Sequence, residues 1–302
     1  MNKVAPLAIF TFNRPHTTKK VLNSLARNKL IEKTNIFFFC DSPKSLKDLK
    51  GRNKVLELIK NFNYCKSKKV IIRKVNFGLK KNILEGLKYI FKKYQKVVVL
   101  EDDIVTSKYF LTYMNNGLQK FKSKKKVGSI HGYCYPIETK RNLEDYFFLR
   151  GADCWGWGTW KDRWALYNDN SKKLFLEIKK KKLIKDFNFY NSYFFSKMLL
   201  NNLKVKEEKK SWAINWYASM YLKNKLTLYP KNSLCKNIGY NVDGTHSLTK
   251  NYIPNMNSKF SKYKNNINIP IQENFFAKKK ISKFLKKLKT FERLNFILNK
   301  FY

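Results

Sequence analysis

The chain has 302 residues, of which 43% are hydrophobic and 16% aromatic, so it can bury the core of one large α/β domain. This composition excludes a disordered chain, and no apolar stretch is long enough to span a membrane. The formal net charge of +43 fits an anionic membrane surface, an anionic substrate or a solvated lysine-rich surface. Nucleic acid is the least favoured partner, because no zinc-finger, RNP or KH motif is present.

Short apolar runs alternate with helical spacing over the first hundred residues. Strands are predicted over Leu7–Phe12, Asn35–Cys40, Lys69–Lys74 and Lys96–Leu100. Helices are predicted from an N-cap at Thr17 or Thr18 to about Asn28, over Leu46–Ile59, and over Leu79–Tyr94. This order predicts an α/β fold with an open, mostly parallel sheet, flanking helices and right-handed crossovers.

The pattern is mixed after residue 108. We expect a helix over Tyr109–Phe121, strands over Val127–His131, Tyr146–Leu149 and Leu226–Tyr229, helices within 172–203 and over Trp212–Lys223, and a loop over 247–270. The predicted organisation is a nucleotide-sugar-binding half at 1–125, an acceptor-binding half at 126–250, and a basic loop with an amphipathic helix at 251–302.

The C-terminal segment from Ala277 to Tyr302 has one apolar stripe and a lysine-rich face. Such a helix can lie flat on an anionic leaflet, and the alternative is that the stripe packs on the catalytic domain or on a second copy of it. The five cysteines are scattered and include no C-x-x-C pair, which favours a reducing compartment. We therefore expect a cytoplasmic protein, with peripheral binding to the inner face of the cytoplasmic membrane as an extension of that hypothesis.

The segment VVVLEDD delivers three acidic residues, Glu101, Asp102 and Asp103, from a buried strand. Ligands of parallel sheets bind beyond the carboxyl ends of the strands, where crowded carboxylates favour a bound cation. Mn²⁺ or Mg²⁺ would share such oxygen ligands with substrate phosphates. The alternative is that these acids merely cap the helix that follows Ser107.

An ordered set of motifs resembles GT-A glycosyltransferases of the family-2 type and, in the later half, N-acetylglucosaminyltransferase I and its bacterial relatives. The first half contributes the strand followed by NRP, the second strand ending in Asp, VNFGLKKNILEGL and VVVLEDD. The later half contributes FFLRGADCWGWGTWKDRW, SWAINWYASMYLKNKLTLYP and NIGYNVDGTHS. The resemblance covers residues 5 to about 250 and implies a GT-A fold.

The resemblance implies a role for each matching residue. Asp103 and His246 correspond to groups that hold the metal. The nucleotide-sugar would be bound by Thr11, Arg14, Asp41, Asn76, Gly78, Lys81, Glu101 and Asp102, with Asp41 reading the uracil. His246 is equally well explained as an ordinary loop histidine.

One departure concerns the general base that an inverting transfer requires. The relatives carry acidic residues in the segment like SWAINW, whereas this chain has Ala213, Ile214 and Asn215 there. Asp153 is the first candidate for the base and Asp162 the second, although a capping role explains Asp153 as well.

The tryptophans beside Asp153 have two interpretations. Trp155 and Trp157, which follow Asp153, and Trp212, which lies farther along the chain, could stack on the apolar faces of an acceptor sugar. The alternative is that these tryptophans fill the core of a small subdomain.

The resulting hypothesis is a metal-dependent glycosyltransferase that uses Mn²⁺ or Mg²⁺. It would move a hexosyl or N-acetylhexosaminyl group from a UDP-sugar to a glycan or a lipid-linked saccharide, with inversion. A sugar nucleotidyltransferase is the rival enzyme, but FTFNRPHTTKK lacks the glycine-rich triphosphate loop of that class. A basic nucleic-acid-binding protein is the rival from another class.

Overall fold

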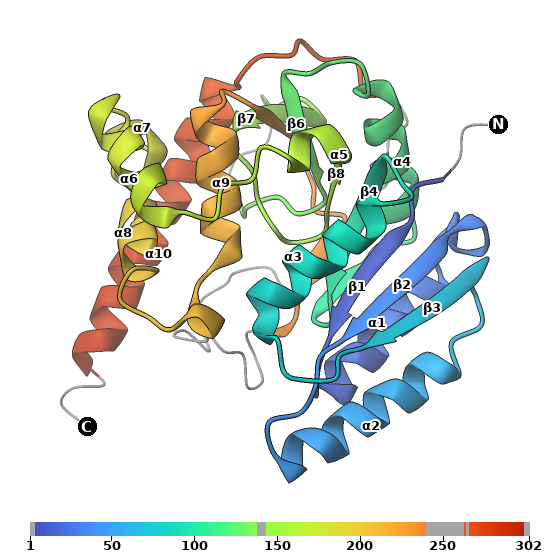
Figure 1. The fold of residues 1–302 in the computed structure, drawn as a ribbon. Helices are drawn as coiled ribbons and strands as arrows, with labels where there is room; N and C mark the ends of the chain where they lie inside the picture. The colour runs from blue at the N-terminus through green and yellow to red at the C-terminus, as the bar shows by residue number, and fades with distance from the viewer. Residues whose placement is uncertain (1–3, 138–142, 240–262, 264–265, 299–302) are drawn as a thin grey trace.

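A computed structural model describes residues 4–137, 143–239, 263 and 266–298, and its centre is an eight-stranded sheet (Figure 1). The strand order is β3-β2-β1-β4-β8-β6-β9-β7. The first half is parallel and consists of β1 (Leu7–Thr11), β2 (Asn35–Cys40), β3 (Ser67–Ile72) and β4 (Lys96–Glu101). The second half is mixed and consists of β6 (Val127–His131), β7 (Tyr146–Arg150), β8 (Trp157–Trp160) and β9 (Leu226–Pro230).

Two layers of helices enclose the parallel half of the sheet. One face packs on α1 (Pro15–Ala26), α2 (Leu46–Lys60) and α4 (Phe110–Lys120), and the other on α3 (Gly78–Phe91) and α9 (Trp212–Leu222). Within β1, Leu7 and Ile9 belong to the first of these cores, and Ala8 and Phe10 to the second. Because successive side chains of a strand point to opposite faces, a fully buried strand requires this continuous apolar run.

A third hydrophobic core lies beyond the mixed half of the sheet. Its helices are α6 (Ser171–Lys180), α7 (Ile184–Phe187), α8 (Phe195–Asn201), α9 and α10 (Phe275–Leu298), and they pack around β7 and β9. The remaining elements are η1 (Ile31–Lys33), α5 (Lys161–Trp164), η2 (Glu207–Lys209), and the two-stranded pair β5 (Ile104–Thr106) and β10 (Cys235–Asn237).

The predicted α/β class, with a mostly parallel sheet, flanking helices and a helical C-terminal segment, is confirmed. The prediction missed β8, because its WGTW sequence lies inside an aromatic segment that shows no alternation. The N-cap prediction for α1 was wrong. Arg14 is the N-cap and Pro15 opens the helix, whereas the hydroxyls of Thr17 and Thr18 donate back to the Arg14 carbonyl at 3.2 and 2.7 Å.

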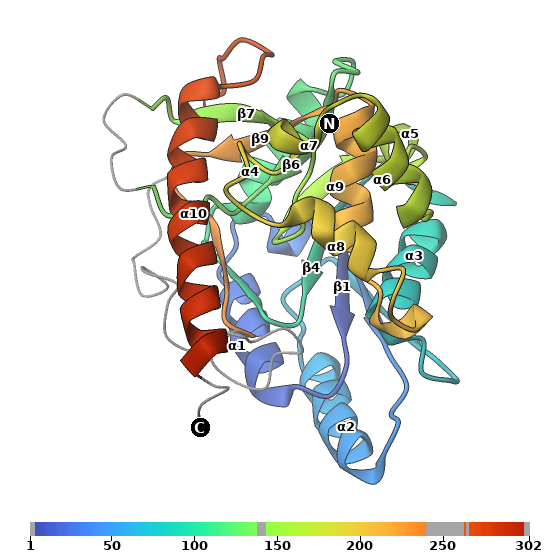
Figure 2. The same ribbon diagram turned by 90° about the vertical axis from the view of Figure 1, so that its left-hand side faces the viewer.

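Helix α10 runs along one side of the molecule, beside β7 (Figure 2). The side chains of Ala277, Ile281 and Leu285 are buried in the third core. Lys278 is also buried, and its Nζ lies 2.7 Å from Asp186 Oδ1 and 3.1 Å from Glu273 Oε1. The prediction that this apolar stripe lies flat on a membrane is therefore wrong for these positions, because the stripe packs on the domain. In the described part of the chain, no helix has the length and apolarity that a membrane crossing requires.

Candidate active site

Three parallel strands end at the same edge of the sheet and bring their following residues together. Phe10 of β1 pairs with Glu101 of β4, and Thr11 pairs with Cys40 of β2. Glu101 ends β4 and is followed by Asp102 and Asp103, and we call these three residues the acidic edge. Arg14 and Asp41 follow the ends of β1 and β2. Strand register alone therefore assembles the residues that the sequence predicted at one sheet edge.

Arg14 is the cation that faces the acidic edge. Its Nη1 donates to Asp103 Oδ2 at 2.9 Å, and its Nη2 donates to Asp102 Oδ1. Asp102 Oδ2 also accepts a hydrogen bond from the backbone N–H of Phe12 at 3.1 Å. The Arg14 side chain is 27% exposed, whereas those of Asp102 and Asp103 are 3% and 11% exposed. Arg14 is thus the solvent-facing side of a buried carboxylate pair.

The carboxyl groups of the acidic edge are crowded, with Asp102 and Asp103 buried and Glu101 half-buried. Burial, reinforced by the charge of Asp103, raises the pKa of Glu101 to about 8 and that of Asp102 to about 6, and Arg14 opposes both shifts. Burial lowers the pKa of Arg14, but the charges of Asp102 and Asp103 more than offset this and leave the Arg14 pKa raised. One guanidinium therefore faces three carboxyl groups, so the edge favours an additional cation.

One oxygen of the acidic edge suits such a cation. Asp103 Oδ1 is buried and has no hydrogen-bond partner among the described residues. Gly239 packs against the same carboxylate, because a Cβ on Gly239 would lie 2.4 Å from Asp103 Oδ2. Mn²⁺ and Mg²⁺ often take only one or two protein carboxylates and complete their coordination with water and phosphate oxygens. The residues present therefore fit a divalent cation held by Asp103.

The described residues contain no cluster of three or more His, Cys, Asp or Glu side chains arranged to hold a metal ion. His246, the other predicted metal ligand, lies outside the described residues. The fit of a metal at this edge therefore depends on Asp103.

Asp41 anchors the loop that leads into α3. Its Oδ1 accepts from the backbone N–H groups of Ser42 and Phe77 at 2.9 and 2.8 Å, and its Oδ2 accepts from Gly78 at 2.8 Å. Asn76 ties the same loop to the carbonyl of Ser42. Gly78 has a φ of +69°, which favours glycine at this position. Uracil reading by Asp41 stays a prediction beside this structural role.

Two other predicted nucleotide ligands lie at the margin of the site. Thr11 is buried, and its hydroxyl donates to Cys40 Sγ at 3.0 Å. Lys81 is exposed on α3, and its Nζ lies 4.4 Å from the centre of the Phe77 ring. Their roles in binding the nucleotide stay predictions.

Asp153 lies in the segment between β7 and β8 and is held at both carboxylate oxygens. The hydroxyl of Tyr135 donates to Oδ2 at 2.7 Å, and the backbone N–H of Cys154 donates to Oδ1 at 2.9 Å. Burial, and then the charges of Asp153, Glu101 and Asp103, raise the pKa of the Cys154 thiol well above its usual range. The charges of Asp153 and of the acidic edge thus both act on Cys154.

The backbone connects the same two regions. Cys235 Sγ contacts the carbonyl of Trp155 at 3.2 Å, and Cys235 opens β10. Strand β10 pairs with β5, which directly follows the acidic edge, and the N–H of Ile238 donates to the Asp103 carbonyl at 2.8 Å. The Asp153 segment and the Asp103 backbone are thus linked through β10.

Sequence reasoning missed Tyr135 and His131. Both lie in or beside the GYCYP segment, where closely spaced aromatic and histidine residues were the available signal. His131 Nε2 accepts from the backbone N–H of Trp155 at 3.1 Å. This bond fixes the segment that carries Asp153.

Asp162 does not fit the role of a second candidate base. Strand β8 is antiparallel to β4, and Trp160 pairs with Lys96 at the start of β4. Asp162 follows Trp160 and therefore lies at the sheet edge opposite the acidic edge. There it pairs with Lys125 and, at 2.8 Å, with Arg163. Burial acts to raise its pKa, but these two cations more than offset that effect and lower it.

Two of the three tryptophans predicted to contact the acceptor are core residues. Trp157 and Trp212 are 0% and 3% exposed, and their rings stack with centroids 5.6 Å apart. Such burial leaves no free ring face for a sugar, so the prediction that these two tryptophans bind the acceptor is wrong. Trp155 is only partly buried and meets the ring of Tyr133 at 4.8 Å between centroids. Trp155 remains the candidate for contacting the acceptor.

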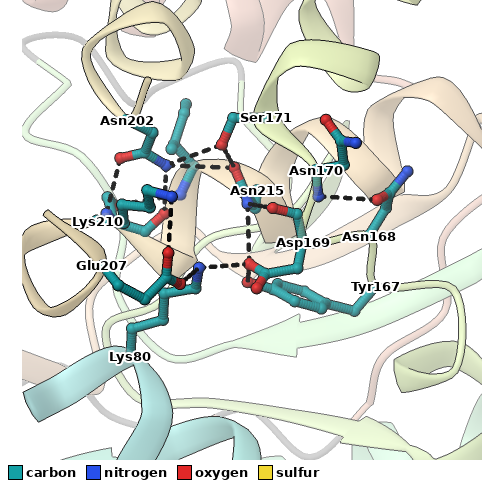
Figure 3. A network of polar contacts seen from close by, with 12 residues as sticks. Lys80, Tyr167, Asn168, Asp169, Asn170, Ser171, Asn202, Glu207, Lys210 and Asn215 are labelled. Carbon is teal, nitrogen blue, oxygen red and sulfur yellow. Dashed lines mark hydrogen bonds and ion pairs between the residues drawn. The ribbon is translucent and has the colours of Figure 1, made fainter. Parts of the chain in front are cut away.

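A polar network joins α3 to the second half of the molecule (Figure 3). Lys80 is at the centre of this network. Its Nζ lies 2.8 Å from Asp169 Oδ1, and it also forms an ion pair with Glu207. Asn215 Oδ1 accepts from the Ser171 hydroxyl at 2.7 Å, and its Nδ2 donates to the Asp169 carbonyl at 3.0 Å. We call Lys80, Asp169, Ser171, Glu207 and Asn215, together with the other residues labelled in Figure 3, the Lys80 network. Asn215 is thus a buried structural group.

No family model matches the sequence, and no curated protein matches it. Solved structures do match. S. aureus TarS in complex with UDP-GlcNAc is 14% identical with a TM-score of 0.42, and the match covers 76% of this chain and 57% of that chain. The Pyrobaculum calidifontis mannosyltransferase PcManGT, in complex with GDP-Man and Mn²⁺, is 11% identical with a TM-score of 0.32, covering 47% of this chain and 37% of that one.

A UDP-glucose pyrophosphorylase complexed with UDP-glucose is 10% identical with a TM-score of 0.37, and the match covers 75% of this chain and 90% of that chain. The chain thus spans 37% and 57% of the lengths of the mannosyltransferase and TarS structures. Because these identities and TM-scores are low, we base the proposed function on the residues of this chain.

Proposed function

We propose that this protein is a glycosyltransferase of the GT-A type that uses a nucleoside-diphosphate sugar as donor and a divalent cation as cofactor. The observation that carries the proposal is the acidic edge beyond the end of β4, where Asp103 Oδ1 is buried and no described residue bonds to it. A buried carboxylate oxygen without a partner is costly, so its presence at a ligand-binding edge of a parallel sheet supports a functional role.

Asp103 would hold the cation, and the cation would supply charge stabilisation to the departing diphosphate. Arg14 and Asp102 lie beside Asp103 and would orient the nucleotide half of the donor. Asp41, Asn76 and Gly78 form the loop that enters α3 and would enclose the nucleotide. A UDP-sugar is the donor that we propose, as the motif resemblance implies.

Asp153 would act as the general base of an inverting transfer. Its carboxylate would take the proton of an acceptor hydroxyl while the oxygen of that hydroxyl bonds to the anomeric carbon and the bond from that carbon to the diphosphate breaks. Two observations support this role. Asp153 is held by Tyr135 at 2.7 Å, and the segment that carries it is joined to the Asp103 backbone through Cys235 and β10.

We propose a glycan or a lipid-linked saccharide as the acceptor, with Trp155 contacting a sugar ring. The outward face of α10 carries the exposed lysines Lys279, Lys283 and Lys286. Each lysine near an anionic membrane contributes about 1 kcal/mol to binding. This face supports electrostatic peripheral binding without insertion, because the apolar stripe of α10 packs inward at Ile281 and Leu285.

A panel of nucleoside diphosphates and their sugar derivatives, each with and without Mn²⁺, tests the proposal by thermal unfolding. A ligand at 100 times its Kd adds about 2.7 kcal/mol, which shifts the Tm of a domain of this size by roughly 5 °C. We expect one nucleotide class to raise the Tm and to require Mn²⁺. The protein should also hydrolyse the matching donor slowly. If no nucleotide shifts the Tm and no donor is consumed, the proposed function is wrong.

A further inference from the structure

The guanidinium of Arg14 is hydrogen-bonded to one oxygen of Asp103, the carboxylate that would hold the cation. It contacts Asp103 through Oδ2 and Asp102 through Oδ1, so it bridges both acids from the solvent side. The other oxygen of Asp103, Oδ1, has no partner among the described residues. Two positive charges at one carboxylate repel each other, and a guanidinium is the group already in place.

Arg14 also has a second class of anion available to it. Its planar fork matches a diphosphate as well as it matches a carboxylate pair. Arg14 lies at the N-cap of α1, next to the end of β1, and keeps 27% of its side chain exposed. The guanidinium can therefore turn to solvent without unpacking the core, unlike the buried ammonium of Lys80, which is 4% exposed.

We propose that Arg14 and a divalent cation compete for Asp103, and that Arg14 exchanges Asp103 for the donor diphosphate when metal and donor bind together. This inference rests on the proposed function, because it takes the diphosphate as the anion that Arg14 meets. Its consequence is ordered binding. The metal alone binds weakly to the acidic edge, and the metal with a diphosphate binds tightly.

The competition can be measured with Mn²⁺ alone, by titration calorimetry and by the paramagnetic resonance signal of free Mn²⁺. We expect Arg14→Met to bind Mn²⁺ at least about tenfold more tightly than the unmodified protein, because the competing charge is gone. Arg14→Lys retains the charge without the fork and should fall between the two. Lys20→Met, an exposed position on α1, removes one positive charge and should leave Mn²⁺ affinity unchanged.

A second titration, with UDP at saturating Mn²⁺, tests the exchange. Arg14→Met should lose at least about tenfold in UDP affinity, although it binds Mn²⁺ better, because one charge-assisted contact is missing. Thermal unfolding without ligand shows whether each variant is folded, and Arg14→Lys serves if Arg14→Met is not.

Unchanged or weaker Mn²⁺ binding by folded Arg14 variants overturns the competition, and unchanged UDP affinity overturns the exchange. Absence of Mn²⁺ binding in every protein overturns the inference as well. The proposed function has a separate test, because the nucleotide-sugar panel can succeed whatever Arg14 does. If that panel fails while Arg14→Met binds Mn²⁺ more tightly, the competition is supported and the claim that Arg14 binds a donor diphosphate is wrong.

Discussion

The acidic edge and the Lys80 network are two clusters of charged and amide groups, and they differ in how completely their buried atoms are bonded. In the Lys80 network, Lys80 meets two carboxylates, and Asn215 uses both its oxygen and its nitrogen (Figure 3). At the acidic edge, three carboxyl groups face Arg14, and Asp103 Oδ1 has no partner among the described residues.

Under the proposed function, this difference separates a structural cluster from a proposed ligand-binding one. A network whose buried groups are bonded to one another fixes the packing, whereas a buried carboxylate oxygen without a partner costs free energy that a bound cation would recover. The Lys80 network joins α3 to η2 and α9, so it connects the two halves of the molecule. We therefore expect changes in the Lys80 network to affect stability and changes at or near the acidic edge to affect chemistry.

The largest expected effect is at Asp153. Asp153→Asn removes the proposed base but keeps the shape of the side chain, so kcat should fall by roughly 10²–10⁴-fold while donor affinity stays unchanged. Steady-state kinetics and a donor-binding isotherm give both numbers. Tyr135→Phe removes only the hydrogen bond to Oδ2, and its smaller loss of kcat is the control. Equal losses of donor affinity and turnover in Asp153→Asn would show that Asp153 is structural.

The next effect tests the structural side of the comparison. Lys80→Met leaves Asp169 and Glu207 without their shared cation, and we expect a loss of about 1–3 kcal/mol in the free energy of unfolding. The loss is moderate because the two carboxylates are 47% and 64% exposed and can regain water. Denaturant unfolding measures it, and Mn²⁺-dependent nucleotide binding should be unchanged. A variant of normal stability that loses nucleotide binding would move Lys80 into the site.

A third prediction uses the opposite pKa shifts of two glutamates. Burial raises the pKa of Glu101 from its ordinary 4.5 to about 8, so the folded protein keeps a proton there that the unfolded chain has lost. Its contribution to stability is full below pH 4.5 and is lost as the pH rises through 8. We expect the Tm without added metal to fall between pH 5 and 8.5, and Glu101→Gln to flatten this slope.

Glu207 is the matched control from the Lys80 network. Hydrogen bonds from Lys210 and then Lys80 lower its pKa, so its contribution is present above its unfolded pKa and is lost only in acid. Glu207→Gln should therefore lower the Tm evenly from pH 5 to 8.5 and leave the slope unchanged. A slope that Glu101→Gln does not alter would contradict the assignment.

The fold followed from local patterns that tertiary packing did not override. Strand β2 was predicted with its observed bounds, and α2 within one residue, because an apolar run and a helical period were uninterrupted. The position of Glu101–Asp103 at a sheet edge followed from the same reasoning. Strand β8 and the partners of Asp153 did not follow, because antiparallel insertion and contacts between distant segments leave no local period.

Burial also decided between interpretations that the sequence left open. Trp155 and Trp157 are two residues apart with the same side chain, yet only Trp157 is enclosed by Trp212 and Trp216. Likewise, the apolar stripe with Ile281 and Leu285 could face either a membrane or a protein core. In the structure these two side chains are buried against β7 and the helices of the third core. The burial of these side chains depends on neighbours from distant parts of the chain, so sequence spacing alone cannot predict it.

The smallest expected effect concerns the outward face of α10. Lys283→Glu with Lys286→Glu should reduce flotation with anionic vesicles at low salt by severalfold, because each lysine contributes about 1 kcal/mol near such a surface. The same change at Lys50 and Lys54 on α2, away from α10 in both views (Figures 1 and 2), is the control. Equal effects of the two pairs would indicate a general charge effect.

The most direct test of the central claim compares two isosteric changes, Asp103→Asn at the acidic edge and Asp169→Asn in the Lys80 network. Calorimetry with UDP and Mn²⁺ is the measurement. We predict that Asp103→Asn abolishes Mn²⁺-dependent UDP binding while its Tm without ligand is retained or raised, because a crowded charge is removed. Asp169→Asn should bind UDP normally with a lowered Tm. Normal Mn²⁺-dependent UDP binding by folded Asp103→Asn would contradict the account.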